Sequence, residues 1–147
     1  MALEAELLPA ERESIAERPT DFEAAYVLYL RARAVVPNLS PSMPIEFFDD
    51  LNRAVAIDPQ FGLAHATLAF SYALASEDST AASATTSYFG LAREEKELLT
   101  LHHAEQALTL DPNQGLAYGA RARLDVDHWR LSDAEANWER ARRARAP

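Results

Sequence analysis

The histidines are the first side chains of this sequence that could do chemistry, because imidazole can bind a metal or transfer a proton. His102 and Glu105 stand three positions apart, which on a helix would place two candidate metal ligands on one face. No second pair with suitable spacing occurs at His65, His103 or His128, and cysteine is absent. We therefore expect no metal site, and we expect the histidines to lie partly exposed on the surface.

The acidic residues and glycines give no better support for catalysis. Glu94 and Glu95 are adjacent, as are Asp49 and Asp50, and adjacent residues on a helix point apart rather than forming an acid/base pair. The chain has no Gly-x-Ser-x-Gly turn to present a nucleophile, and its 4 glycines form no phosphate-binding loop. We expect a protein that is not an enzyme and that needs no cofactor.

Composition points to one all-α domain. The 147 residues are 48% hydrophobic and 25% charged, which suits a folded chain of a single domain or a short repeat array. Alanine and leucine greatly outnumber valine and isoleucine, which favours helices over strands. The net charge of -9 argues against nucleic-acid binding. The absence of a long apolar stretch or a signal-peptide pattern predicts a cytoplasmic protein that does not bind membranes.

The sequence repeats itself, and the repeats predict where helices begin and end. The segment from Asp58-Pro59 to Ala64 recurs 53 positions later from Asp111-Pro112 to Ala117, and a second offset of 34 aligns Ala107 with Ala141. Each proline stops a helix, and the aspartate before it can accept backbone hydrogen bonds. Residues 20–23 and 132–135 fit capping boxes. Helices are expected near 3–17, 21–36, 45–57, 61–76, 89–110, 114–129 and 132–145.

The pattern of small and large residues resembles a tetratricopeptide repeat array. The third copy carries the resemblance best, with Tyr118, Ala122, Ala134, Trp138 and Ala141 at the spacing of that repeat. The resemblance implies an antiparallel helix-pair superhelix of three repeats plus an extra N-terminal helix. The single domain 1–147 would then comprise a capping helix at 1–19, repeats at 20–59, 60–112 and 113–147, and an insertion near 76–90.

A narrower resemblance concerns one bacterial group. The segments Ala25–Arg33, Ala54–Pro59 and Asp127–Trp138 are similar to the tetratricopeptide segment of regulators with a winged-helix DNA-binding domain or an adenylate-cyclase-type domain. This resemblance implies an alternative function, as a regulatory or dimerisation module of such a bacterial transcription regulator or cyclase-type protein.

Peptide binding is the function that the repeat resemblance implies most directly, through a concave groove lined by the first helix of each pair. Tyrosine, phenylalanine and arginine are enriched in interaction hot spots, and arginine can hold a carboxylate through two hydrogen bonds. Tyr26 and Tyr29 could instead be packing residues under the N-terminal helix. The expected lining residues are Tyr26, Tyr29, Arg33, Leu63, Ala66, Phe70, Ala73, Leu116, Gly119, Arg123 and Asp127.

The last expected helix suggests a second surface. Its Trp138 and Ala141 side would stay uncovered unless it pairs with another copy of the chain, as a homodimer through the C-terminal repeat, or with a following domain. We therefore expect a non-catalytic module whose partner is a protein or peptide. A clamp for chaperone tails is not expected, because such clamps use several lysines and Lys96 is the single lysine here.

Overall fold

The computed structural model describes residues 19–40, 42–75 and 91–144, and within these ranges every regular element is an α-helix. The all-α expectation is therefore confirmed for the described part of the chain. The predicted helix at 3–17 and the predicted insertion near 76–90 lie outside the described residues. The helices are α2 (Glu23–Val35), α3 (Ile45–Ile57), α4 (Gly62–Ala75), α5 (Arg93–Leu110), α6 (Gly115–Asp127) and α7 (Leu131–Ala144).

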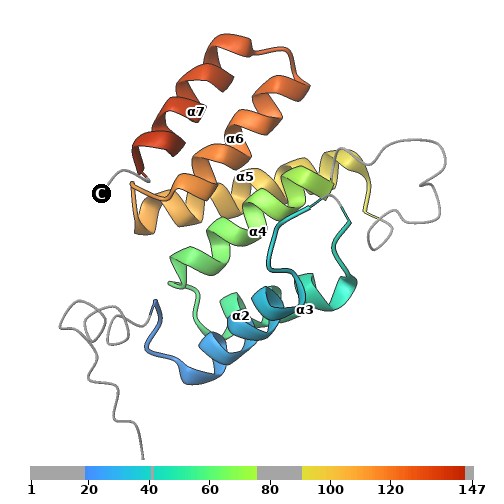
Figure 1. The fold of residues 1–147 in the computed structure, drawn as a ribbon, viewed down its shortest axis with the longest axis vertical. Coiled ribbons are helices and arrows are strands. Elements are labelled where there is room, and N and C mark those ends of the chain that lie inside the picture. Colours follow the sequence, from blue (N-terminus) through green and yellow to red (C-terminus); the bar gives the residue numbers. More distant parts are fainter. Residues whose placement is uncertain (1–18, 41, 76–90, 145–147) are drawn as a thin grey trace, which may run out of the picture.

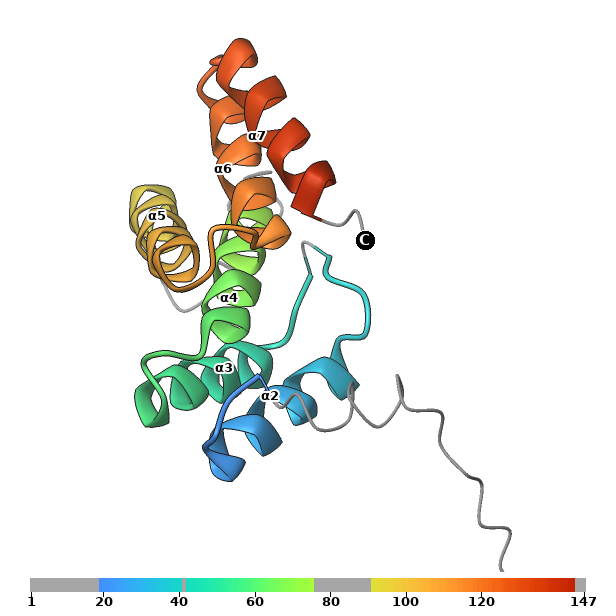
Figure 2. The same cartoon turned by 90° about the vertical axis from the view of Figure 1, so that its left-hand side faces the viewer.

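Consecutive helices pack side by side as α2–α3, α4–α5 and α6–α7, running in opposite directions (Figure 1). Helix α6 also packs on α4 and α5, so it lies between α5 and α7 (Figure 2). The observed helices match the expected ones to within a few residues. None of the described helices combines the length and the apolar character needed to cross a bilayer.

The turns after α3 and α5 have the predicted chemistry. Each helix ends at the aspartate before a proline, where the side chain accepts a backbone N–H two residues later. The Asp58 carboxylate accepts from Gln60 N at 3.0 Å, and the Asp111 carboxylate accepts from Asn113 N at 2.9 Å. These bonds hold the chain in a tight corner, so the next helix starts beside the one that has ended.

The two predicted capping boxes are not formed. Helix α2 begins after Phe22, and the Thr20 hydroxyl accepts from Phe22 N and donates to Asp58 instead. Thr20 therefore ties the start of the first pair to the turn at its end. Helix α7 already begins at Leu131, which places Ser132 inside the helix rather than at its cap.

The interior divides into two clusters of different character. The first, between α2, α3 and α4, is built from large side chains that include Phe47, Phe48, Leu51 and Phe61, all at most 1% exposed. The second, between α4, α5 and α6, consists of fully buried alanines. Small side chains let helix backbones approach closely, so α6 is seated tightly against the α4–α5 pair.

Candidate functional site

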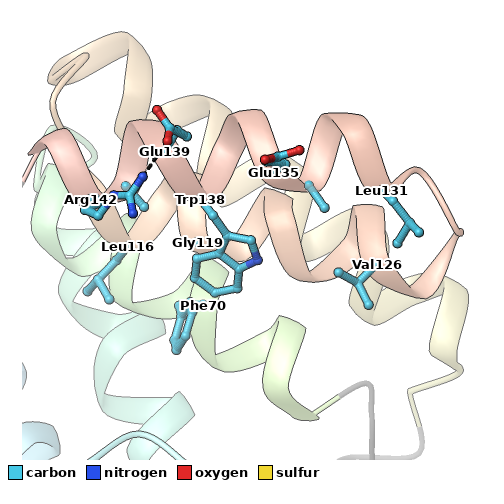
Figure 3. A pocket seen from close by; sticks show the side chains of 12 residues that line it. Phe70, Leu116, Gly119, Val126, Leu131, Glu135, Trp138, Glu139 and Arg142 are labelled. Carbon is cyan, nitrogen blue, oxygen red and sulfur yellow. Dashed lines mark hydrogen bonds and ion pairs between the residues drawn. The ribbon is translucent and has the colours of Figure 1, made fainter.

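An open pocket of about 690 Å³ lies along α6 and α7 and reaches down to α4 (Figure 3). Val126 and Leu131 lie at one end of it, while Leu116 and Arg142 lie at the other. We call this pocket the α6–α7 groove. Its lining residues are Phe70, Gly115, Leu116, Gly119, Val126, Leu131, Ala134, Glu135, Trp138, Glu139, Ala141 and Arg142.

The centre of the groove is aromatic. A Cβ added at Gly119 would lie 3.1 Å from the Phe70 ring and 3.6 Å from the Trp138 ring, so this glycine allows both rings to pack against the α6 backbone. Trp138 nevertheless keeps 43% of its surface exposed. A half-exposed tryptophan beside further exposed apolar side chains is typical of an interaction surface.

Charged side chains stand on the α7 side of the groove. Glu135, Glu139 and Arg142 line it together with the apolar residues. Glu139 forms ion pairs with Arg142 and, at 3.1 Å, with Arg143. These groups are largely exposed to solvent, so the pairs contribute little to stability, but they give the groove both signs of charge.

A buried polar network fixes the angle between the two helices that form the groove. Asp125 is 7% exposed and accepts hydrogen bonds from Arg130 Nε at 3.0 Å, Arg130 Nη2 at 2.8 Å and Asn137 Nδ2 at 2.8 Å. The corner between these helices contains Trp129 in the left-handed region, with φ 58°. These contacts tie the corner and α7 to the end of α6.

The structure brings together residues from both predicted surfaces. Phe70 and Leu116 from the expected peptide groove lie in the α6–α7 groove with Trp138 and Ala141 from the expected assembly face. Gly119, also expected in the peptide groove, is the close-contact point between the two aromatic rings. Three residues of the expected peptide groove and two of the expected assembly face therefore share one groove in the structure.

The other expected groove residues lie elsewhere. Three of them pack against the first core cluster, and Tyr29 stacks at a tilt on Phe61 with ring centroids 5.3 Å apart. Burial raises the pKa of the Tyr29 hydroxyl. Two alanines belong to the fully buried cluster under α6. The three residues that pack against the first core cluster are Tyr26, Tyr29 and Leu63, and the two alanines of the buried cluster are Ala66 and Ala73.

The expected charged residues of the peptide groove do not line the α6–α7 groove. Arg33 donates to the Pro37 carbonyl at 3.0 Å. Asp127 lies 3.8 Å from the Arg93 guanidinium of α5. Arg123 is partly buried on α6 and does not line the groove.

Two histidines that were expected on the surface form a buried cluster. His65 and His103 are each 5% exposed, and their Nδ1 atoms lie 2.9 Å apart. His65 Nε2 lies 3.0 Å from the Pro59 carbonyl, which can only accept, so Nε2 of His65 carries the proton. In a neutral ring, His65 Nδ1 is then the acceptor and His103 Nδ1 the donor. Expected surface histidines are thus a buried hydrogen-bonded pair.

Burial keeps this pair neutral. Desolvation lowers the pKa of His65, and it lowers the pKa of His103 to about 3 with help from the nearby His65 and His102. The Tyr72 ring stacks on His103 with centroids 6.0 Å apart. No cluster of three or more metal-ligating side chains occurs within the described ranges. The His65–His103 hydrogen bond links α4 to α5.

Several residues that line the groove were missed from the sequence. Some of them lie on the last helix at successive spacings of four, three and four residues. Residues at such spacings share one helical face, so this pattern could have identified them. That stripe consists of Leu131, Glu135, Trp138 and Arg142. Val126 lies beside it at the end of α6, in a position that only the three-dimensional arrangement reveals.

No protein-family model, no curated protein and no solved structure matches the chain. The resemblance to tetratricopeptide repeats therefore rests on the residues of the sequence alone.

Proposed function

We propose that this protein is a non-catalytic helical-repeat module that binds a polypeptide helix in the α6–α7 groove. The observation that carries the proposal is Trp138, which is 43% exposed at the centre of a preformed apolar groove. A tryptophan in such a position offers a large area for burial on binding at a small cost in side-chain entropy.

A tetratricopeptide-like arrangement supports this proposal. Small residues recur at equivalent positions on the second helix of each pair and are all buried: Ala54, Ala107 and Ala141. Three consecutive helix pairs with α6 seated on α4–α5 are consistent with a repeat array. In such arrays each pair leaves a face that another helix can cover.

The groove suits a helix rather than an extended strand. Its apolar residues follow the length of α6 and α7, from Leu116 past Trp138 to Leu131. An amphipathic helix could lay its apolar stripe along this line by the helix-in-groove mode of recognition. No sheet edge exists within the described residues to which a strand could be added.

The two tryptophans of the chain provide a matched test. Trp138 lines the groove, while Trp129 is 84% exposed at the α6–α7 corner and does not line it. A displayed library of amphipathic helical peptides, selected on the full chain, should yield binders that lose affinity at least about tenfold with Trp138→Ala. Trp129→Ala should retain them, and circular dichroism should report both variants as folded. Equal affinity for both variants would refute binding in the groove.

A further inference from the structure

The position of the α6–α7 groove is defined by the internal repeat. One repeat earlier, five alanines of α4 and α5 are buried with Ala117 and Ala120 of α6 in one cluster. The fifth, Ala69, corresponds to Ala122, which is fully buried and does not line the groove, whereas the other four correspond to groove residues. These four are Ala66, Ala73, Ala104 and Ala107. The residues 53 positions after the first two and 34 positions after the last two are Gly119, Val126, Trp138 and Ala141. All four of these equivalents line the groove.

The groove is therefore the equivalent of a surface that already receives a helix within this chain. At the earlier surface the equivalents of Trp138 and Ala141 are each 0% exposed, because α6 covers them. At the groove Trp138 is 43% exposed and Val126 is 47% exposed. The earlier repeat has the small Ala104 at the equivalent position, which allows α6 to approach closely. The last repeat has Trp138 there, whose ring offers a large apolar contact surface.

The charges along α7 indicate which helix fits. Glu135, Trp138 and Arg142 follow one another on the groove face, with the acid on one side of the tryptophan and the base on the other. In an antiparallel pair of identical helices centred next to Trp138, Glu135 of each copy would face Arg142 of the other. Such a surface is self-complementary, as a two-fold interface requires.

The ion pairs already present permit this exchange. Glu135 forms no ion pair within the described part of the chain. Arg142 is paired with Glu139, which keeps a second partner in Arg143 if Arg142 turns away. Pairing with a second copy would therefore add an ionic contact at Glu135 without leaving Glu139 unpaired.

We propose that the occupant of the α6–α7 groove is α7 of a second copy of this chain, arranged antiparallel about a two-fold axis beside Trp138. This inference rests on the proposed function, because it names the helix that the groove binds. The apolar contact of the two Trp138 rings would supply affinity, and the two Glu135–Arg142 contacts would fix the direction of the helices.

Charge reversal on the full chain tests the proposal. Analytical ultracentrifugation over a range of concentrations should show a dimer that Arg142→Glu weakens at least about tenfold, because it places like charges opposite each other twice per dimer. Glu135→Arg should do the same, and the double reversal should restore dimerisation. Arg143→Glu is the matched control, since it also removes one ion pair to Glu139 but does not line the groove.

Tryptophan fluorescence provides a second measurement of dimerisation, besides the mass from ultracentrifugation. In a Trp129→Phe background Trp138 is the single tryptophan, so its emission should shift to shorter wavelength as dimerisation buries it. The emission shift should follow the same concentration dependence as the mass. In the Arg142→Glu variant the shift should occur only at a higher protein concentration.

The outcomes separate this inference from the proposed function. A protein that stays monomeric while Trp138-dependent peptide binding persists would overturn the second copy as occupant and leave the groove as a binding site for a foreign helix. A monomer that also binds no helical peptide would overturn both proposals. A dimer equally sensitive to Arg142→Glu and Arg143→Glu, or one not restored by the double reversal, would overturn the antiparallel arrangement.

Discussion

Acidification should destabilise the fold through the buried His65–His103 pair. The folded-state pKa of His103 is lowered to about 3 from the ordinary 6.5 by burial and by the neighbouring histidines. Below pH 6.5 the unfolded chain therefore binds a proton that the folded chain excludes, and stability falls as the pH falls toward 3. At about pH 5 the difference of roughly 1.5 units corresponds to about 2 kcal/mol for His103 alone.

Urea denaturation at a series of pH values measures this loss, with His103→Gln as the informative variant. Glutamine does not titrate, so the free energy of unfolding of His103→Gln should fall by about 2 kcal/mol less than that of the wild type between about pH 7.5 and about pH 5. His102→Gln is the matched control, because His102 is the exposed neighbour on the same helix. This variant keeps the buried His65–His103 pair, so it should still lose stability on acidification.

Nuclear magnetic resonance gives a direct check of the same reasoning. The His103 ring should not titrate near pH 6.5 in the folded protein. A His103 titration at the ordinary midpoint, or identical pH slopes for the wild type and His103→Gln, would refute the assignment of a buried neutral pair.

Three further variants test other parts of the structure. Alanine in a helix interior is ordinarily more stabilising than glycine by about 1 kcal/mol, but Gly119→Ala should lack this gain in thermal denaturation, because its Cβ would lie 3.1 Å from the Phe70 ring; a melting temperature raised by the full gain would contradict the close contact. Asp50→Asn should lower the urea midpoint at neutral pH, because the Arg31 guanidinium binds the buried Asp50 carboxylate and lowers its pKa; this deficit should vanish in acid, where Asp50 is protonated. Trp129→Gly should raise stability by up to about 1 kcal/mol, since φ 58° favours glycine; a lower melting temperature would show that the exposed ring makes a stabilising contact.

The helices were predictable because their boundaries are determined locally. Pro59 and Pro112 end helices for steric reasons that hold in any context, and the preceding aspartates accept backbone N–H groups within two residues. The expected cap at Thr20 was wrong because the Thr20 hydroxyl has a long-range alternative. It donates to Asp58, which is 38 positions away and comes close only when the first helix pair has formed.

The site was only partly predictable because it depends on which helix faces remain uncovered. Phe70 and Trp138 were selected for their residue types, but the sequence assigned them to different surfaces. Their contact across Gly119 arises from the angle between α4, α6 and α7. The burial of His65 could have been recognised, since Leu68, Ala69 and Tyr72 follow it at helical spacing and all are buried.

Helix α4 has a consequence for how the protein unfolds. All of its residues are buried except Gly62, Leu63 and Phe70, and it contributes side chains to both the aromatic and the alanine cluster. Neither half can therefore melt while the other keeps its core, as separate repeats otherwise can. We expect this shared helix to make the transition cooperative, with hydrogen exchange slowest along α4 and faster in α7, which belongs to neither cluster.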